Sequence, residues 1–418
     1  MIMEASKRQD LLTLMADKMN RAVRLYLENC SRCGTCIDAC HAYASTRDIR
    51  FSAVGRAQNV RRLFENYFRV TGKIAPWLND AETLDEAWMD KLYETAFSCT
   101  GCRRCMVYCP FGIDTQQIQA IAKALLIGMD MDPKPLTMRA RGEIDKAKNL
   151  ELTRQKLEKE LTGVKAELLE KYPSLEGKEI VPLDKEGANI LFVSMVEKPS
   201  IASGAAILNA AGESWSLSYF EAVNFGAFAG NANMSEQIYG RIVAEAERLR
   251  VKELVICECG TAYRIMKHII GKRSFRVISI LELVNRYLTE GRIKLDKSSI
   301  EGTVTYHDPC QIARNSGVYE APRNVIRAFT DSFVEMIPNR SENWCCGGGG
   351  GLVIAQEPEF RMMTSRVKAD QIRAAGADIL ATACEMCLAQ LKDLNDEFEL
   401  ETDVKLVSDL VYEALVFS

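Results

Sequence analysis

The sequence predicts an α + α/β fold in which an all-helical N-terminal module precedes a duplicated α/β domain. Three observations carry this prediction. Apolar residues recur at helical spacing within residues 1–130, short apolar runs typical of buried strands recur after residue 187, and all fifteen cysteines fall into four clusters. Cysteines used only for packing would be scattered, so this usage indicates bound metal.

Length and composition are those of an ordinary globular protein. The 418 residues suffice for two or three domains, and 47% hydrophobic and 26% charged residues are usual values. A formal net charge of −4 argues against a dedicated nucleic-acid binder. The charged N-terminus lacks the apolar region of a secretory signal, and no stretch approaches roughly 18 uncharged apolar residues. We therefore expect a cytoplasmic protein whose reduced cysteines serve metals, with membrane contact only through a partner subunit.

Residues 1–130 are expected to form a helical module with two cysteine loops. One amphipathic helix precedes the first loop and another follows the second, as marked by apolar residues at Leu11, Leu12, Leu14, Met15 and Met19, and at Ile118, Ile121, Ala122, Leu125 and Leu126. Residues 41–98, between the loops, contain several aromatic and basic side chains.

Residues 131–186 are predicted to be a charged helical linker. One apolar seam runs through a dense Lys/Glu background, at Leu150, Leu157, Leu161, Val164 and Leu168. The seam either docks a partner or lies on the same protein, and the second interpretation is the simpler. Pro173, Gly177 and Pro182 then end the helical pattern.

From residue 187 to residue 418 the pattern becomes α/β. Four short apolar runs are expected to be buried strands, with helices between them. The strands are predicted at Ile190–Val193, Leu254–Ile256, Val304–Tyr306 and Ile379–Leu380, and the helices at Ala244–Leu249 and Arg361–Ala375.

The α/β part also contains an internal repeat. Two pairs of segments align, residues 188–196 with 302–310 and residues 252–260 with 377–385. On this register Cys259 matches Cys384, whereas Val196 stands opposite Cys310. We therefore expect a degenerate copy that lost most of its cysteines and an intact copy that kept them. The predicted copies are residues 187–300 and 301–418.

The first two cysteine clusters share the spacing C-x2-C-x2-C-x3-C, at Cys30, Cys33, Cys36 and Cys40 and again at Cys99, Cys102, Cys105 and Cys109. Such a run supplies three thiolates to one [4Fe–4S] cluster and sends its fourth cysteine to the other cluster in two-cluster proteins. Zinc is the alternative, but zinc sites usually show two separated cysteine pairs. The long gap between the runs favours an all-helical ferredoxin module. We expect two cubanes, one on Cys30, Cys33, Cys36 and Cys109 and one on Cys99, Cys102, Cys105 and Cys40.

One residue departs from the bacterial ferredoxin pattern. Pro110 follows Cys109, but His41 follows Cys40. Proline is not a ligand, so cluster binding survives its loss. His41 either hydrogen-bonds a cluster sulfur and tunes its potential or lies in a solvated loop, and the loop is the simpler expectation.

The C-terminal cysteines form a rarer constellation. Adjacent cysteines are hard to place on one cubane face and suit a cluster whose irons are unusually spread. The glycine run Gly347–Gly351 allows close approach of the backbone and positive φ. A phosphate-binding loop is the rival interpretation, but the run lacks the G-K-[ST] ending. The cysteines of this constellation are Cys310, Cys345, Cys346, Cys384 and Cys387.

These motifs resemble a known family. The spacing C-x34-C-C-G-x36-C-x-x-C looks like the CCG domain of heterodisulfide-reductase-type proteins. The segments CSRCGTCIDACHAYASTRD, FSCTGCRRCMVYCPFGIDT and YHDPCQIARNSGVYEAPR are similar to the D subunit of heterodisulfide reductase. They are also similar to the K subunit of the membrane complex that serves dissimilatory sulfite reductase, and to electron-transfer subunits of benzoyl-CoA reductase complexes. The resemblance covers nearly the whole chain outside residues 131–186.

The resemblance implies one noncubane [4Fe–4S] cluster held by Cys310, Cys345, Cys346, Cys384 and Cys387. Cys259, and less so Cys257, would approach it as a ligand or redox partner. In the mechanism that the resemblance implies, a substrate sulfur binds this cluster while a disulfide breaks. His307 and Asp308 are candidates to protonate the departing thiolate, since histidine titrates near neutrality. The alternative is that Asp308-Pro309 only shapes a turn.

Two functions follow from these expectations. The chain is an iron–sulfur electron-transfer subunit that passes single electrons through two cubanes to or from the noncubane site, or it is a catalytic subunit that cleaves a small-molecule or protein disulfide. Whether the chain is itself an enzyme stays open. The sequence has no flavin or nicotinamide fingerprint, so we expect redox partner subunits that carry flavin, tungsten or haem, including a membrane subunit. A redox sensor is disfavoured, because three clusters in series exceed what sensing needs.

Overall fold

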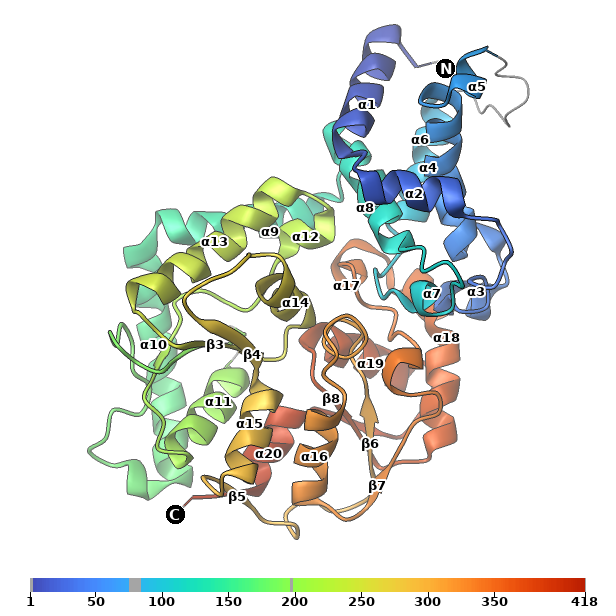
Figure 1. Ribbon diagram of the computed structural model, residues 1–418. Coiled ribbons are helices and arrows are strands. Elements are labelled where there is room, and N and C mark those ends of the chain that lie inside the picture. Colours follow the sequence, from blue (N-terminus) through green and yellow to red (C-terminus); the bar gives the residue numbers. More distant parts are fainter. Residues whose placement is uncertain (1–2, 75–83, 196–197, 418) are drawn as a thin grey trace. The chain divides into compact units, whose positions relative to one another are not determined.

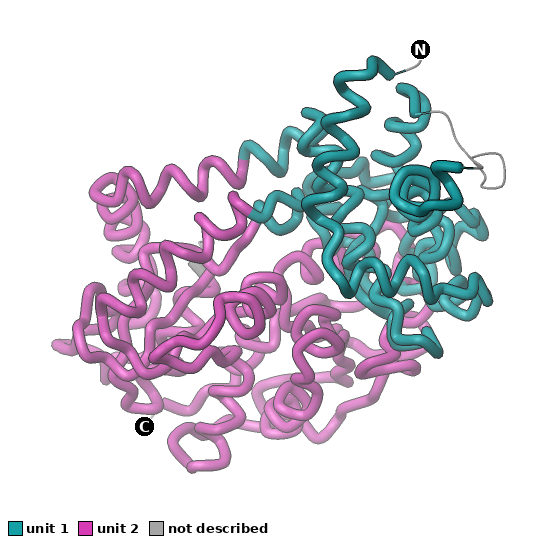
Figure 2. The backbone as a smooth tube through the Cα atoms, turned by 45° about the horizontal axis from the view of Figure 1, so that its top comes forward, with its two compact units in different colours: residues 1–138, 225–232, 344–368 teal, residues 139–224, 233–343, 369–418 magenta. Residues whose placement is uncertain are grey.

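The computed structural model describes residues 3–74, 84–195 and 198–417. The chain divides into two compact units, coloured separately in Figure 2. Unit 1 comprises residues 1–138, 225–232 and 344–368, and unit 2 comprises residues 139–224, 233–343 and 369–418. Each unit is therefore assembled from segments that are far apart in the sequence.

Unit 1 is built from helices (Figure 1). They are α1 (Ala5–Lys18), α2 (Arg21–Asn29), α3 (His41–Thr46), α4 (Ala53–Tyr67), α5 (Val70–Ile74), α6 (Glu86–Ala96), α7 (Arg104–Val107), α8 (Thr115–Gly128), α12 (Phe225–Ala229) and α17 (Leu352–Ala355), with a 3₁₀ turn at Ile49–Phe51. Helices α9 (Lys134–Lys148) and α18 (Pro358–Ala375) begin in unit 1 and continue into unit 2. The helical prediction for both sides of the cysteine loops is confirmed.

Side-chain caps fix where several of these helices begin. The side-chain oxygens of Asn20, Ser52, Asp85 and Asp114 accept backbone N–H groups at the first turns of α2, α4, α6 and α8. Such caps satisfy N–H groups that have no partner within the helix. The cap at Asn20 splits the helix expected before the first loop into α1 and α2. The apolar face of α8 is buried in the core of unit 1 together with Leu11 and Met15.

Unit 2 contains, among the described residues, two four-stranded parallel sheets with the same strand order. One is ordered β2-β1-β3-β4 and the other β7-β6-β8-β9. Their bounds are β1 (Ile190–Val193), β2 (Trp215–Leu217), β3 (Glu253–Ile256), β4 (Arg276–Ser279), β6 (Val304–His307), β7 (Phe333–Val334), β8 (Ile379–Thr382) and β9 (Asp403–Leu406). The inner strands β1, β3, β6 and β8 are buried along their whole length, as inner strands of a covered parallel sheet are. A duplicated α/β domain would have this arrangement.

Helices join the two sheets of unit 2 into one hydrophobic core. Helix α15 packs on α16, α11 packs on α20, and α20 also contacts α15 and α16. A short antiparallel pair, β5 with β10, adds a further link. The elements of unit 2 not yet placed are α10 (Leu150–Lys171), α11 (Lys198–Ala210), α13 (Ala232–Arg248), α14 (Gly260–His268), α15 (Ile280–Thr289), α16 (Glu320–Phe329), α19 (Glu385–Glu397), α20 (Val407–Ala414), β5 (Lys294–Leu295) and β10 (Leu415–Val416), with 3₁₀ turns at Pro173–Leu175 and Arg340–Glu342.

The apolar seam of the predicted linker packs on the same protein. Leu161, Val164 and Leu168 are buried in the core of unit 2, where α10 lies against α11. Leu150, at the start of the helix, is 44% exposed. The interpretation of this seam as a helix that lies on its own protein is confirmed.

The four predicted strands are present, each within one residue or two of its expected bounds. The flanking strands β2, β4, β7 and β9 were not anticipated. Val196, which the repeat alignment sets opposite Cys310, lies outside the described residues. None of the helices in the described ranges combines the length and the apolar character that crossing a bilayer requires.

Candidate metal centres

Unit 1 brings the eight cysteines of the two regular runs together around two cavities. The residues that line the first cavity include Cys30, Cys33, Cys36 and Cys109. Those that line the second cavity include Cys40, Cys99, Cys102 and Cys105. Each cavity therefore takes three cysteines from one run and the fourth from the other run, which is the grouping expected from the spacing.

The two runs share a backbone conformation around their middle cysteine. In the first run Arg32 and Gly34 have φ values of 58° and 85°, and in the second run Gly101 and Arg103 have values of 68° and 61° at the same positions. Left-handed residues within a tight turn direct successive N–H groups to one side and form a nest for an anionic group. Nests of this kind are found at many iron–sulfur sites.

The donor sets fit clusters that are bound by thiolates. Burial, followed by the charges of Cys30 and Cys109, raises the pKa of the Cys36 thiol to about 11. Burial and the charges of Cys102 and Cys99 raise the pKa of Cys105 well above its usual range. Crowded thiols of this kind ionise readily only beside added positive charge, which metal ions supply. Four cysteine thiolates are the usual ligand set of a [4Fe–4S] cluster.

A buried guanidinium faces the second cavity. Arg56 of α4 is 3% exposed, and its Nη1 lies 3.2 Å from Sγ of Cys40. Its Nε and Nη2 donate to the hydroxyl and the carbonyl oxygen of Ser98, both at 2.9 Å. Burial raises the pKa of the Cys40 thiol, but the charge of Arg56 and the contact with His41 outweigh burial and lower this pKa to about 5.

The Cys345–Cys346 doublet belongs to unit 1 with the rest of residues 344–368. Sγ of Cys345 lies 3.4 Å from the hydroxyl oxygen of Thr100, inside the second cysteine run. The neighbouring Trp344 packs under Arg104, whose guanidinium carbon is 3.5 Å from the ring centroid. The doublet is therefore anchored beside the second cavity.

The glycine run lets the backbone approach the second cysteine run closely. A Cβ atom at Gly350 would lie 2.8 Å from the carbonyl oxygen of Cys99, closer than real Cβ contacts. Gly347, Gly350 and Gly351 have φ values of 94°, 64° and 84°. The expected positive φ is confirmed at these positions, while the approach to a cluster stays a prediction. The N–H groups of Gly347 and Gly348 also point at the sulfurs of the doublet, at 3.4 and 3.5 Å.

His41 is buried beside the second cavity and the doublet. It opens α3 and is 2% exposed, so the expectation of a solvated loop is wrong. One of its ring nitrogens and the sulfurs of Cys102 and Cys345 lie within 4.8 Å of one another. Burial lowers the pKa of the imidazole, but Cys345, Cys102 and Cys40 outweigh burial and raise it to about 10. The arrangement fits the alternative in which His41 contacts cluster-binding sulfurs.

The other three cysteines of the CCG constellation belong to unit 2, where they are buried. Cys384 occupies the N-cap of α19. Its pKa is lowered to about 7, first by a hydrogen bond with Cys387 and then, against the effect of burial, by backbone N–H groups that include that of Gly260. Cys310 follows β6 in the turn that leads to α16. The N-terminus of α14 thus contributes a donor to the sulfur of Cys384.

The two cysteines after β3, Cys257 and Cys259, lie in different environments. Cys257 is fully buried and accepts a hydrogen bond from the hydroxyl of Ser200 at 3.4 Å. Cys259 occupies the N-cap of α14, and burial followed by the charge of Cys384 raises its pKa to about 12. A backbone hydrogen bond of 3.0 Å from Glu385 to Glu258 ties the two turns together. Cys259 is the member of the pair that lies near Cys384.

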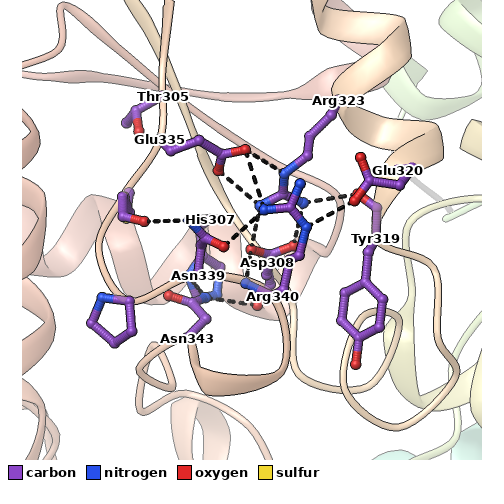
Figure 3. A network of polar contacts seen from close by, with 12 residues as sticks. Thr305, His307, Asp308, Tyr319, Glu320, Arg323, Glu335, Asn339, Arg340 and Asn343 are labelled. Atoms are coloured by element: carbon purple, nitrogen blue, oxygen red, sulfur yellow. Dashed lines mark hydrogen bonds and ion pairs between the residues drawn. The ribbon is translucent and has the colours of Figure 1, made fainter.

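Figure 3 shows the polar network around the two predicted proton donors. The carboxylate of Asp308 accepts both terminal nitrogens of Arg323 and the backbone N–H of Arg340, each at 2.8 Å. Arg323 is fully buried and also bonds Glu335. This engaged carboxylate favours the turn-shaping alternative for Asp308.

His307 ends β6 in a buried position. It is 1% exposed, and its Nδ1 lies 3.2 Å from the side-chain nitrogen of Asn343 (Figure 3). Its role as a proton donor stays a prediction.

Comparisons with known proteins agree with this cysteine chemistry. The family model of the 4Fe-4S dicluster domain matches residues 26–113, which span both regular runs, and that of the cysteine-rich CCG domain matches residues 304–392. The chain is therefore similar to iron–sulfur proteins that carry these two domains. It combines an N-terminal ferredoxin-like dicluster domain with a C-terminal CCG domain.

Several named proteins are similar over most of this chain. An Hdr-like menaquinol oxidoreductase iron-sulfur subunit 2 of Archaeoglobus fulgidus is 28% identical over 98% of this chain and 84% of its own length. A dihydromethanophenazine:CoB–CoM heterodisulfide reductase subunit of Methanosarcina mazei is 26% identical over 93% of this chain and 94% of its own length. An EtfAB:quinone oxidoreductase of Syntrophomonas wolfei is 23% identical over 94% of this chain, which spans 58% of that protein.

The residues that sequence reasoning missed are the polar neighbours of the cysteines. Arg56 and Thr100 line the second cavity, and Lys123 contacts the carbonyl oxygen of Cys99. Thr100 stands inside the motif, but Arg56 and Lys123 lie on helices outside it. No spacing rule marks those two positions, because their contacts depend on how the helices pack.

Proposed function

We propose that the chain is an iron–sulfur electron-transfer subunit of a heterodisulfide-reductase-like redox complex. In this role it passes single electrons through two cubane clusters to or from a noncubane [4Fe–4S] site. One observation carries the proposal. Unit 1 contains two cavities, each lined by four cysteines, and the second lies beside the cysteine doublet.

The proposal assigns ligands to each cluster. One cubane takes Cys30, Cys33, Cys36 and Cys109, and the other takes Cys40, Cys99, Cys102 and Cys105, in line with the two cavities. The noncubane cluster takes Cys310, Cys345, Cys346, Cys384 and Cys387. All five lie within residues 304–392, which match the cysteine-rich domain. The chain supplies the thiolates, while the clusters, when bound, supply one-electron redox chemistry.

Cys259 rather than Cys257 is proposed to act with the noncubane site. The Cys259–Gly260 turn donates a backbone N–H to Cys384 and packs tightly on the loop after Cys310. A Cβ atom at Gly260 would lie 2.9 Å from Cβ of Gln311. The degenerate copy thus supports the intact copy at this point.

The remaining expectations belong to the same proposal. Residues 1–130 form the dicluster domain, residues 131–186 the linker, and residues 187–300 and 301–418 two copies related by duplication, which the shared strand order supports. Partner subunits carrying flavin, tungsten or haem would exchange electrons with the chain. Two relatives are named as subunits, which supports the presence of partners. A cytoplasmic location, or attachment to a membrane through a partner, rests on the use of reduced cysteines as ligands.

A catalytic role in disulfide reduction is the second candidate. The name of the relative from Methanosarcina mazei favours it, since that protein is part of a heterodisulfide reductase. In this case the noncubane site would bind a substrate sulfur, and His307 would protonate the departing thiolate.

Iron content tests the cluster count. Anaerobically purified protein should hold about 12 iron atoms, four for each of three clusters. A value of about 8 would mean that the CCG site is empty. C30S and C99S should each remove or convert one cubane, as followed by EPR of the dithionite-reduced protein.

EPR during thiol addition separates the two candidates. If the chain is catalytic, the oxidised protein should give a new paramagnetic signal when a thiol or disulfide is added. An unchanged spectrum with every thiol tested, in protein with full iron, would reject disulfide cleavage by the isolated chain and leave electron transfer.

A further inference from the structure

Buried cations are distributed unequally between the two cysteine cavities. At the second cavity, Nη1 of Arg56 lies 3.2 Å from the sulfur of Cys40. At the first cavity Arg61 is also buried. It donates to the carbonyl oxygen of Leu27 and to the side chain of Gln58, and within the described residues its Nη2 has no hydrogen-bond partner. Of these two arginines, it is Arg56 that contacts a cysteine sulfur directly.

A second buried cation contacts another cysteine of the same cavity. Nζ of Lys123 is 3.5 Å from the carbonyl oxygens of Cys99 and Phe228 and 3.4 Å from that of Gly350. Three segments of unit 1 therefore meet on one ammonium group. At the first cavity, Arg32 is about half exposed and is paired with Glu65 at 3.1 Å, so its charge is screened.

The two cavities also differ in their surroundings. The first includes Cys33, which is exposed, and Phe111, which is 58% exposed. The second borders the doublet through Thr100 and Cys345. Within unit 1, the first cavity is thus accessible to an external electron donor, and the second leads to the doublet.

We propose that Arg56 makes the second cavity the higher-potential of the two cubane sites, so that electrons in unit 1 run from the first cavity to the second and on towards the doublet. This inference rests on the proposed function. Each one-electron reduction adds one negative charge to a cluster, and net charge and hydrogen bonds to the sulfurs set cluster potentials. A buried guanidinium that donates to Cys40 stabilises the added charge and raises the potential.

The electron balance of the step is simple. One electron leaves the reduced first site, which is thereby oxidised by one unit, and the second site is reduced by one unit. A one-electron donor protein reloads the first site. Solvent near Cys33 also stabilises charge added to the first site. The proposal is that Arg56, which donates to Cys40 from hydrogen-bond distance in a buried place, stabilises charge added to the second site more.

Potentiometric EPR of the anaerobic full-length chain tests the order of the two sites. Wild-type protein should give two cubane signals with separate midpoint potentials. C33S and C102S each alter one cavity and therefore assign the signals. The signal altered by C102S should be the one that titrates at higher potential.

Four further variants test the part played by Arg56. R56M should shift the second-cavity signal to lower potential and leave the first-cavity signal in place. R56K, which retains the charge, should keep most of the wild-type potential, and S98A, which removes one anchor of the guanidinium, should give a smaller downward shift. R61M is the matched control, a buried arginine at the first cavity, and should move only the first-cavity signal.

Two results would overturn the inference. Either the signal altered by C102S titrates at the lower potential in wild-type protein, or R56M and S98A with full iron leave that potential unchanged. If R56M fails to assemble, R56K and S98A still decide the question. A wild-type protein with only one cubane signal would instead refute the two-cubane assignment of the proposed function.

Discussion

The two sheets of unit 2 have the same strand order, but different functional side chains follow their strands. Both β3 and β8 end in a turn in which a cysteine, Cys259 or Cys384, occupies the N-cap position of the next helix. After the neighbouring strands the copies diverge, since β6 leads to Asp308 and Cys310 whereas the equivalent β1 leads to Ser194. The sheets share one hydrophobic core through the helices between them, so the sheet without a full cysteine set also contributes to that core.

This difference separates the residues that stabilise the fold from the residues that are proposed to bind metal. Apolar strands and their order are the same in the two sheets, whereas the proposed ligands Cys310, Cys384 and Cys387 follow strands of one sheet. The buried carboxylates illustrate the contrast. Asp308 in the intact copy is paired with Arg323, whereas Glu245 in the degenerate copy accepts hydrogen bonds from Ser218 and Tyr219.

Removal of single cysteines should give the largest measurable difference between the two copies. C384A should lose about four of about 12 iron atoms, because it removes a proposed ligand of the noncubane cluster. C257A should lose none, since that thiol is hydrogen-bonded to Ser200 inside the core. Iron analysis of the anaerobic proteins measures both. Equal loss in the two variants would mean that the remnant copy also holds metal.

Breaking the ion pair of the intact copy should have the next largest effect. R323M should lower the free energy of unfolding by about 3–5 kcal/mol, because it leaves the carboxylate of Asp308 buried without its cation. The double variant D308S/R323M, which copies Ser194 of the first copy, should be less destabilised than R323M alone. Urea unfolding followed by tryptophan fluorescence checks both, and a double variant as unstable as the sum of its parts would contradict the idea.

In the degenerate copy, by contrast, ionisation of a buried carboxylate should lower the stability of the protein. Burial raises the pKa of Glu245 from 4.5 to about 7. The folded state then binds this proton more tightly than the unfolded state, so stability falls as pH rises from about 4.5 to 7 and stays reduced above that. E245Q should remove roughly 2–3 kcal/mol of this loss. Melting temperatures at acid and alkaline pH measure it, and a parallel pH dependence of E245Q and wild type would exclude this residue as a cause.

Exchanging equivalent residues of β1 and β6 should give the smallest effects. The ring of Phe192 faces Gly204, where even a Cβ atom would lie 2.1 Å from its outermost carbon, so the hydroxyl of F192Y should cost about 1–3 kcal/mol. Tyr306 stands at the same place in β6, and within the described residues its hydroxyl has no hydrogen-bond partner. Y306F should therefore change stability by less than about 1 kcal/mol. Unfolding curves that rank the two variants the other way would contradict the equivalence.

The inner strands could be predicted from the sequence because they are continuous apolar runs. The outer strands β4 and β9 were not predicted, because they contain polar residues and are not continuous apolar runs. Both have exposed, buried, partly exposed and buried residues in turn, but only Asp403–Leu406 alternates polar and apolar side chains, since Arg276–Ser279 reads Arg-Val-Ile-Ser. A search for continuous apolar runs misses both strands, and a search with period two would have found β9.

The candidate site shows the same limit of local sequence patterns, here for contacts between residues that are far apart in the chain. Cysteine spacing predicted which four residues line each cavity in unit 1, because a short loop fixes the positions of its own ligands. It did not predict that His41 is buried. The residues that cover His41 include Cys345, which follows it by some three hundred positions, and no local pattern records that contact.

The composition of unit 1 has a consequence for the making of the protein. Its last segment, residues 344–368, is translated after most of unit 2. Chains emerge from the ribosome N-terminal end first, and domains fold as their residues become available. Both cysteine runs are therefore synthesised long before the glycine run that closes over Cys99 and Thr100. The protein has an extended interval in which these thiols can receive iron and sulfide before its own backbone covers them.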